Sequence, residues 1–248
     1  MRAPIRLLWM LALPLLAQEP TPSSQQTTPP EASPSSVLTR AVQMYDSRNY
    51  VAALPAFQQA ARGGLADAMM YLGVMFAQGQ GTRVDFAQAV NWFQKAADLG
   101  VSQAMCNLGS LYYQGAGVTR KYDEALRWFN RCATAGNEQG MYNLAVMYRD
   151  GTGVNKNVEE AFKWFERAAE EGNPLAMNSL GVMYRMGQGT RADYPAAMEW
   201  FQKAARNGVG EAMFNLGVMF ERGLGVVANP DEAKRWYARA IDAGYQTP

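Results

Sequence analysis

A glycine recurs at intervals of 36 residues along most of this 248-residue chain. The positions are Gly64, Gly100, Gly136, Gly172, Gly208 and Gly244. Self-similarity at a fixed period of this length is typical of repeat proteins, in which each unit packs mainly on its neighbours. The period therefore predicts a linear array of similar units rather than one globular core.

Each unit has the pattern of two helices. In the unit 173–208, Leu180 and Tyr184 have helical spacing before a glycine-rich break, and Trp200 and Ala204 have it after the break. The same residue types occupy the same columns in the neighbouring units. The sequence therefore predicts a helical hairpin in each unit.

The break carries a Gly-x-Gly pair in each unit. The pairs are Gly79 and Gly81, Gly115 and Gly117, Gly151 and Gly153, Gly187 and Gly189, and Gly223 and Gly225. The first glycine suits the left-handed residue that follows a helix end. Such a pair can also indicate phosphate binding, but no predicted strand precedes it and no dinucleotide-binding pattern follows. We interpret it as a turn.

A capping residue precedes the second helix of most units. The column reads Asn49, Asp85, Lys121, Asn157, Asp193 and Asn229. Asparagine and aspartate side chains accept a hydrogen bond from an otherwise unpaired amide of the first turn. Lysine cannot do so, and we expect the helix after Lys121 to have the loosest start.

Two sets of columns indicate how the helices pack. Glycines stand inside the first helix, where glycine costs about 1 kcal/mol relative to alanine, and we expect them to admit the facing helix at its alanine column. The two columns are Gly73, Gly109, Gly181 and Gly217, and Ala89, Ala125, Ala161, Ala197 and Ala233. In the second helix a tryptophan is followed each time by phenylalanine or tyrosine. We expect one ring of each pair to pack inside its own hairpin and the other to meet the next repeat.

The full pattern, A-M-x-x-L-G-x-M-[YF] followed by G-x-G and A-x-x-W-[FY]-x-[KR]-A-A-x-x-G, resembles the Sel-one-like repeat, a relative of the tetratricopeptide repeat. The resemblance covers five units, 65–100, 101–136, 137–172, 173–208 and 209–244, with 37–64 as a divergent first helical repeat and 245–248 as a tail. It implies an all-α, right-handed α/α superhelical solenoid of antiparallel helix pairs. It also implies an adaptor that binds a protein or peptide, without naming the partner.

The amino-terminal residues have a different composition. Residues 1–17 combine Arg2 and Arg6 with an apolar run that ends at Ala17, which predicts a cleaved signal peptide and a secreted or periplasmic protein, with a retained anchor as the alternative. The apolar run is too short to span a bilayer comfortably. Residues 18–36 are rich in Pro, Ser, Thr and Gln and predict a disordered tether. A proline-rich recognition segment is the other interpretation of this stretch.

The composition argues against histidine-dependent catalysis, histidine-ligated metal sites and nucleic-acid binding. The chain has no histidine, which excludes histidine-dependent catalytic triads and histidine-ligated metal sites, and we expect no cofactor, metal or catalytic residue. Its formal charge of +1, with mixed signs along the chain, gives no nucleic-acid footprint. We expect no membrane span in the mature chain.

Two cysteines, Cys106 and Cys132, lie in the two helices of the second unit. The resemblance implies that Cys-rich relatives bridge neighbouring repeats at the columns of Ala97 and Met105, which both cysteines miss by one residue. Cys132 fits as a small core residue, and a bridge within the hairpin is the alternative in an oxidising compartment.

The binding surface is predicted from two first-helix columns that vary where the packing columns do not. Carried over from tetratricopeptide relatives, they place a concave groove at Tyr113, Tyr142, Arg149, Asn178, Arg185, Phe214 and Glu221. The aromatic residues would anchor a bound segment, and Arg149 and Arg185 would pair with its carboxylate. The alternative function is binding or hydrolysis of a cell-wall or β-lactam-like ligand, as in the Cys-rich relatives.

An end-to-end contact is expected at the last helix, Pro230 to Ala243. The chain continues for only four residues after Gly244, and Ile241 stands in a column where other repeats have alanine. Because the ends of a solenoid usually need a polar face, we expect a partner or a second copy to dock there.

Overall fold

The computed structural model describes residues 33–246, which form α-helices joined by short turns. Two compact units can be distinguished in it, one of residues 33–104 and 114–119 and one of residues 105–113 and 120–246. The first contains α1 (Pro34–Asp46), α2 (Tyr50–Arg62), α3 (Ala66–Gln78) and α4 (Phe86–Asp98). The second contains most of α5 (Ser102–Gln114), then α6 (Tyr122–Thr134), α7 (Glu138–Asp150), α8 (Val158–Glu170), α9 (Pro174–Met186), α10 (Tyr194–Arg206), α11 (Gly210–Arg222) and α12 (Pro230–Asp242).

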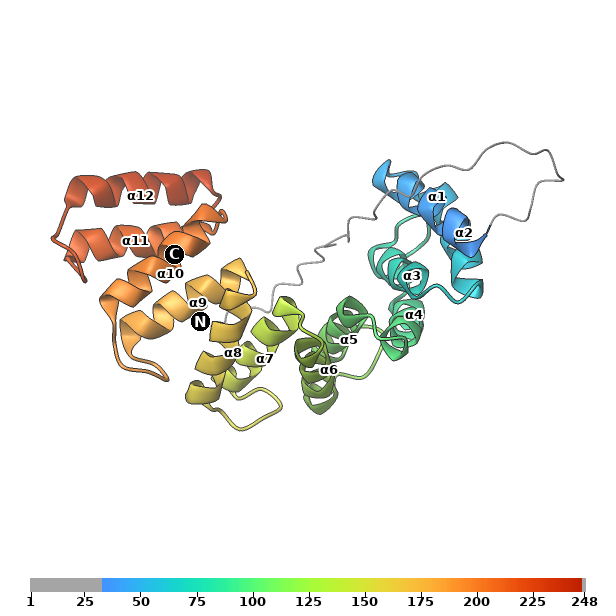
Figure 1. Ribbon diagram of the computed structural model, residues 1–248, viewed down its shortest axis with the longest axis horizontal. Helices are drawn as coiled ribbons and strands as arrows, with labels where there is room; N and C mark the ends of the chain where they lie inside the picture. The colour runs from blue at the N-terminus through green and yellow to red at the C-terminus, as the bar shows by residue number, and fades with distance from the viewer. Residues whose placement is uncertain (1–32, 247–248) are drawn as a thin grey trace. The chain divides into compact units, whose positions relative to one another are not determined.

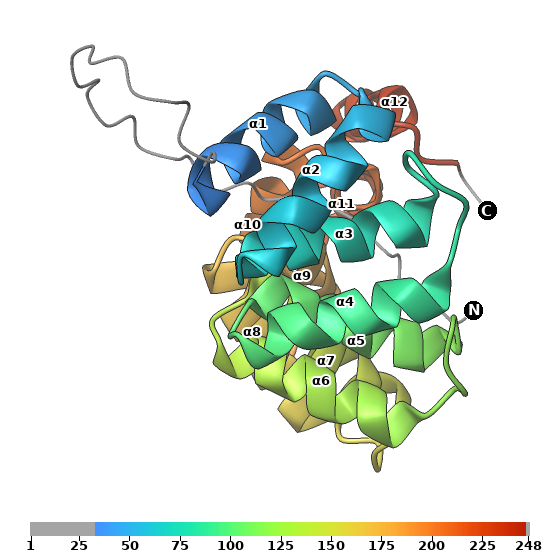
Figure 2. The same ribbon diagram turned by 90° about the vertical axis from the view of Figure 1, so that its right-hand side faces the viewer.

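Each helix packs against the next one along the chain within its unit. Helices α1 to α4 do so in the first unit and α6 to α12 in the second. Figure 1 shows this succession most clearly for α11 and α12, which lie side by side, and Figure 2 shows it for α1 and α2. The predicted all-α solenoid of helix pairs with a 36-residue period is confirmed.

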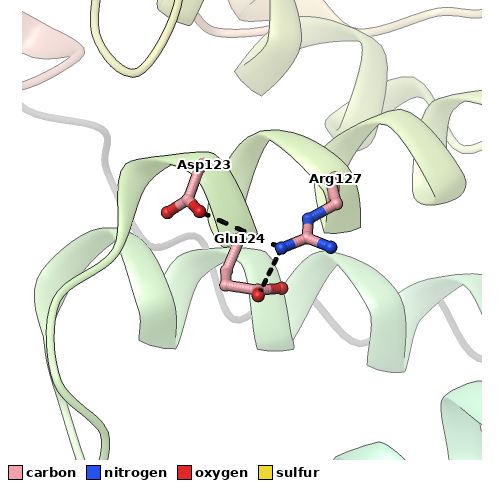
Figure 3. Close-up of polar contacts among 3 residues, drawn as sticks. All are labelled: Asp123, Glu124 and Arg127. Carbon is pink, nitrogen blue, oxygen red and sulfur yellow. Dashed lines mark hydrogen bonds and ion pairs between the residues drawn. The ribbon is translucent and has the colours of Figure 1, made fainter.

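Side-chain caps start the second helices where the sequence places them. The carboxylate of Asp193 accepts from the amide of Ala196 at 2.9 Å, and the side chain of Asn157 accepts from the amide of Glu160 at the same distance. Lys121 makes no such bond at the start of α6. The first turn of α6 carries acidic side chains instead, and Arg127 pairs with both Asp123 and Glu124 (Figure 3). Carboxylates there favour the helix through its dipole but leave the amides without a cap.

The two glycines of each turn have different structural roles. Gly187 ends α9 in the left-handed conformation, with φ of 64°, as predicted. Gly189 also has a positive φ, of 69°, and a Cβ atom there would lie 2.7 Å from the carbonyl oxygen of Val158 at the start of α8. The second glycine therefore lets the turn of one repeat approach the backbone of the preceding repeat, a reason that the sequence alone did not give.

The glycine column inside the first helices faces aromatic rings, phenylalanine in three repeats and Tyr237 in the last, rather than the alanine column. A Cβ atom on Gly181 would lie 2.7 Å from the ring of Phe201, and one on Gly73 would lie 2.4 Å from the ring of Phe93. Both rings are fully buried. The expected close approach is present, but the side chain that it admits is aromatic. This is the ring that packs inside its own hairpin.

The tryptophans of the second helices lie nearer the surface, each beneath a cation. A basic side chain three residues later stands over the indole ring at 4.1 to 4.8 Å from its centroid. The pairs are Trp92 with Lys95, Trp128 with Arg131, Trp164 with Arg167, Trp200 with Lys203, and Trp236 with Arg239. A cation over an indole face is stabilising by about 0.5 to 1 kcal/mol at exposed sites.

The first helix begins earlier than the sequence indicated. Helix α1 starts at Pro34 rather than Val37, because the side chain of Ser33 caps the amide of Ser36 and proline suits the first helical turn.

The predicted signal peptide and most of the predicted tether lie outside the described residues. None of the helices between residues 33 and 246 is long and apolar enough to cross a membrane.

Candidate functional site

The predicted groove residues share one face of each first helix in the second unit. Tyr142 and Arg149 are seven residues apart on α7, and Asn178 and Arg185 are seven apart on α9. Seven residues are nearly two helical turns. Each helix therefore presents two of the predicted side chains in the same direction, one above the other.

A hydrogen bond joins helices α9 and α11 on this face. The side-chain nitrogen Nδ2 of Asn215 on α11 donates to Oδ1 of Asn178 on α9 at 3.2 Å. Both side chains are buried, with exposed fractions of 6% and 5%. Asn178 thus joins two repeats. Its predicted contact with a bound segment stays a prediction.

Other buried polar residues along this face were missed by the sequence reasoning. Asn107 and Asn143 stand 36 residues apart, and Asn143 is 36 residues before Ser179, which is itself 36 residues before Asn215. Asn107, Asn143 and Asn215 are buried. Their common column was visible in the sequence, since polar residues recur there beside the invariant leucine. This column lies beneath the exposed side chains of the face and is not part of its variable surface.

Tyr142 is packed into the face rather than standing free. Its ring meets the ring of Phe165 edge-on, with centroids 5.7 Å apart. Burial raises the pKa of the Tyr142 hydroxyl, the nearby positive charge of Arg149 acts to lower it, and the negative charge of Glu211 adds to the rise. The hydroxyl therefore stays protonated and can donate a hydrogen bond.

Arg149 already has a carboxylate partner. Its Nε and Nη2 atoms donate to the two oxygens of Asp150 at 2.8 and 3.1 Å, and its guanidinium stands 5.9 Å from the centroid of the Phe165 ring. Burial acts to lower the pKa of Arg149, but the hydrogen bonds and charge of Asp150 outweigh it and the pKa is raised. A bidentate pair of this kind is strong and fixes the guanidinium.

Arg185 is half-buried and has no such partner. Neither Arg185 nor Arg222 forms an ion pair with any residue between 33 and 246. Burial lowers the pKa of the Arg185 guanidinium, and the like charge of Arg222 lowers it further, while Glu211 partly opposes both effects. The sequence did not place Arg222 in the groove, because it stands one residue after the column of Arg149, Arg185 and Glu221.

Glu211 connects three first helices electrostatically. From α11 it acts on the pKa values of Tyr142 and Arg149 on α7 and on that of Arg185 on α9. Side chains of three successive repeats therefore lie within electrostatic reach of one carboxylate. They share one surface, which is called the inner face below and comprises Tyr142, Arg149, Arg185, Glu211 and Arg222.

The remaining predicted residues make contacts within the chain. Tyr113 meets Tyr122 edge-on at 5.2 Å between centroids. Phe214 packs in tilted geometry against Tyr237 at 5.2 Å and against Tyr245 at 5.1 Å. These aromatic side chains are therefore held in place, which lowers the entropic cost of using them as anchors.

Glu221 accepts a hydrogen bond from the hydroxyl of Tyr237 at 3.0 Å. Burial and the bond to Glu221 raise the pKa of Tyr237 to about 12. Glu221, which belongs to the column of Arg185, thus bonds to α12 within its own hairpin.

The two cysteines form a disulfide within one hairpin. Cys106 of α5 and Cys132 of α6 are bridged across Cα atoms 5.4 Å apart. This settles the alternative that the sequence left open. The bridge lies inside one repeat, whereas the resemblance implied bridges between repeats for Cys-rich relatives.

Two other expectations concern metals and the last helix. No cluster of cysteine and carboxylate side chains suited to a metal ion occurs among residues 33–246.

Ile241 on α12 is 63% exposed. The expected end-to-end contact through this helix stays a prediction.

The sequence pattern of the Sel1 repeat matches the chain at residues 66–101, 102–137, 139–173, 174–209 and 210–245. The chain belongs to the Sel1 repeat family. The five Sel1 repeats correspond to the five predicted units with a shift of one residue for most boundaries. No curated protein sequence gives a match.

Solved Sel1 repeat structures have a similar fold. The crystal structure of c5321, a protective antigen present in uropathogenic Escherichia coli strains and displaying an SLR fold, is 32% identical with a TM-score of 0.78. The match covers 85% of this chain and 46% of c5321, so the chain spans less than half of that protein. A Sel1 repeat protein from Oxalobacter formigenes is 26% identical with a TM-score of 0.78, over 84% of this chain and 83% of that one.

An immunity protein from Pseudomonas aeruginosa, Pa5087, shares the fold at 20% identity. Its TM-score is 0.55, and the match covers 82% of each chain.

Proposed function

We propose that this Sel1 repeat protein is a secreted or periplasmic scaffold that binds a peptide or protein segment on the inner face of α7, α9 and α11. A repeat scaffold of this family is typical of protein-interaction domains. The observation that carries the proposal is the reach of Glu211, which stands on α11 and acts on side chains of the two preceding first helices, α7 and α9. A surface built by three repeats suits an extended segment better than a small molecule.

The inner face has the composition of a recognition surface. Tyr142 is an aromatic side chain packed against Phe165, and Arg185 is a cation that forms no ion pair among the described residues. Tyrosine and arginine dominate the binding energy of many interfaces, because each combines large contact area with directed hydrogen bonds.

The disulfide supports the proposed secreted or periplasmic location. Disulfides persist in secreted and periplasmic proteins and are rare in the reducing cytosol. The bridge between Cys106 and Cys132 therefore agrees with the signal peptide expected at residues 1–17.

The test is selection of displayed random peptides on the purified protein. A variant combining Tyr142→Phe with Arg185→Gln should bind the selected peptides at least tenfold more weakly, about 1.4 kcal/mol. Phenylalanine is used because Tyr142→Ala would also remove packing against Phe165. Arg206→Gln is the matched control, since Arg206 ends the second helix α10 and is exposed.

Two results of the peptide selection would contradict the proposal. Peptides whose binding survives in the inner-face variant but is lost in Arg206→Gln would place the site on the other side of the repeats. A protein that selects no peptide at all would not be a scaffold of this kind.

A further inference from the structure

We propose that Arg185 and Arg222 together form a binding site for one carboxylate group of the bound segment. This inference rests on the proposed scaffold function and names the chemistry of its ligand. It replaces the pairing of Arg149 with Arg185 that the sequence suggested, because Asp150 already occupies the guanidinium of Arg149.

The helix register brings the two arginines together. Asn178 on α9 and Asn215 on α11 are in direct contact at 3.2 Å. Arg185 follows Asn178 by seven residues, and Arg222 follows Asn215 by seven residues. First helices of successive repeats run in the same direction, because each is followed by a helix that reverses the chain. Two turns along both helices, the arginines therefore lie above the asparagine pair on adjoining faces.

The two cations have no ion-pair partner among residues 33–246, and Glu211 compensates the charge of Arg185 only in part. Burial disfavours the charged form of Arg185, and repulsion by Arg222 disfavours it further. Two like charges held together with one of them half-buried are electrostatically costly unless an anion neutralises them. Most other cations of the second unit that are not fully solvated have a partner, such as Arg149 with Asp150 and Lys203 with Glu199.

The charge balance favours a carboxylate over a phosphate. The charged groups that act on Arg185 are Arg222 and Glu211, and the three together sum to +1. One carboxylate neutralises this set, whereas a phosphate dianion would leave it negative. Glu221, the neighbour of Arg222 in the chain, accepts the hydroxyl of Tyr237. Guanidinium groups bind carboxylates through paired hydrogen bonds, which gives direction as well as charge.

The first test needs no ligand. Replacing Arg222 by glutamate removes the repulsion and offers Arg185 an ion pair, so Arg222→Glu should raise the thermal midpoint by about 1 to 3 °C. Arg206→Glu makes the same charge change on an exposed part of α10 and should not raise it. An equal response of the two variants would overturn the proposal, because it would show that Arg185 and Arg222 do not interact.

The second test uses random hexapeptides in two forms, one with free and one with amidated carboxyl ends. Peptides selected by the protein should depend on a carboxylate, from aspartate, glutamate or the chain end. Its conversion to an amide should weaken binding about tenfold. The loss should be absent in Arg185→Gln, since the carboxylate then has no paired site. The two forms distinguish a terminal carboxylate from a side-chain carboxylate.

The outcomes separate this inference from the scaffold function. Tight binding of peptides without dependence on a carboxylate would overturn the arginine site and leave the scaffold function standing. Tighter binding after replacement of the carboxylate by phosphoserine would overturn it in favour of a phosphate site. Selection of no peptide would overturn both.

Discussion

Gly181 shows how a single missing side chain organises a repeat. A Cβ atom on it would lie 2.7 Å from the fully buried ring of Phe201. Gly181→Leu should therefore lower stability by about 1 to 3 kcal/mol, despite the helical propensity that it gains. Val182→Leu, one position further on a half-buried residue, should change stability by less than about 0.5 kcal/mol. Urea unfolding measures both, and equal midpoints would contradict the packing argument.

The sequence predicted this glycine column but not its partner. A recurring column indicates that small size matters at Gly181, since glycine inside a helix needs compensation. It does not say which facing side chain fills the space, because that depends on the angle and offset between the helices. The alanine column and the phenylalanine column were both compatible with the pattern, and the structure assigns the contact to Phe201.

The disulfide is the second feature that acts at the residue scale. It closes a loop across a sequence separation of 26 residues, which corresponds to about 3.5 kcal/mol in the loop-entropy model. Replacing both Cys106 and Cys132 by alanine should lower stability by up to that amount. Alanine at Cys132 leaves packing unchanged, since Ala96 and Ala168 occupy the same column and are fully buried.

A reducing agent provides the matched control for the disulfide. It should lower the unfolding midpoint of the unmodified protein and leave that of the double alanine variant where it is. If the reductant moved both midpoints equally, or neither, the bridge would not contribute to stability.

The start of α6 is the informative case at the scale of a helix. Lys121 has backbone angles of −142° and 106°, close to the −142° and 98° of the capping residue Asp193. Only the capping side chain is missing. Lys121→Asp should therefore stabilise the protein by about 0.5 to 1 kcal/mol. Thermal unfolding measures the gain.

Arg120→Asp tests whether the gain comes from the cap or from the charge. It makes the same charge change one residue earlier, outside the capping position, near the same carboxylates Asp123 and Glu124. The stability of Arg120→Asp should rise by less than that of Lys121→Asp. An equal rise in both variants would show that net charge, rather than a hydrogen bond to the first turn, limits α6.

Helix starts and ends were the part of the fold best predicted from sequence. Caps and left-handed glycines act over three or four residues, so the chain itself contains both partners of each contact. Asn157 and Gly187 are correct examples. Ser33 was missed because its cap lies in a stretch whose composition resembles a tether.

The inner face could be predicted only in part, because it is a property of several repeats together. The variable columns led to Tyr142, Arg149 and Arg185 on their own helices. They could not reveal that Glu211 acts on side chains of two other first helices, or that the charge of Arg222 acts on Arg185. These relations depend on the offset from one repeat to the next, which a periodic pattern does not contain.

At the scale of the whole molecule, export and the disulfide make one joint prediction. The signal peptide expected at residues 1–17 would carry the chain into an oxidising compartment, where Cys106 and Cys132 become bridged. The exported protein should therefore begin at Gln18 and weigh two hydrogen atoms less than the reduced chain, as intact mass would show. The same chain expressed without residues 1–17 in a reducing cytosol should react with a thiol reagent at both cysteines, after unfolding. An exported form that retains Arg2 would indicate a membrane anchor, and one whose cysteines react without reductant would separate the bridge from export.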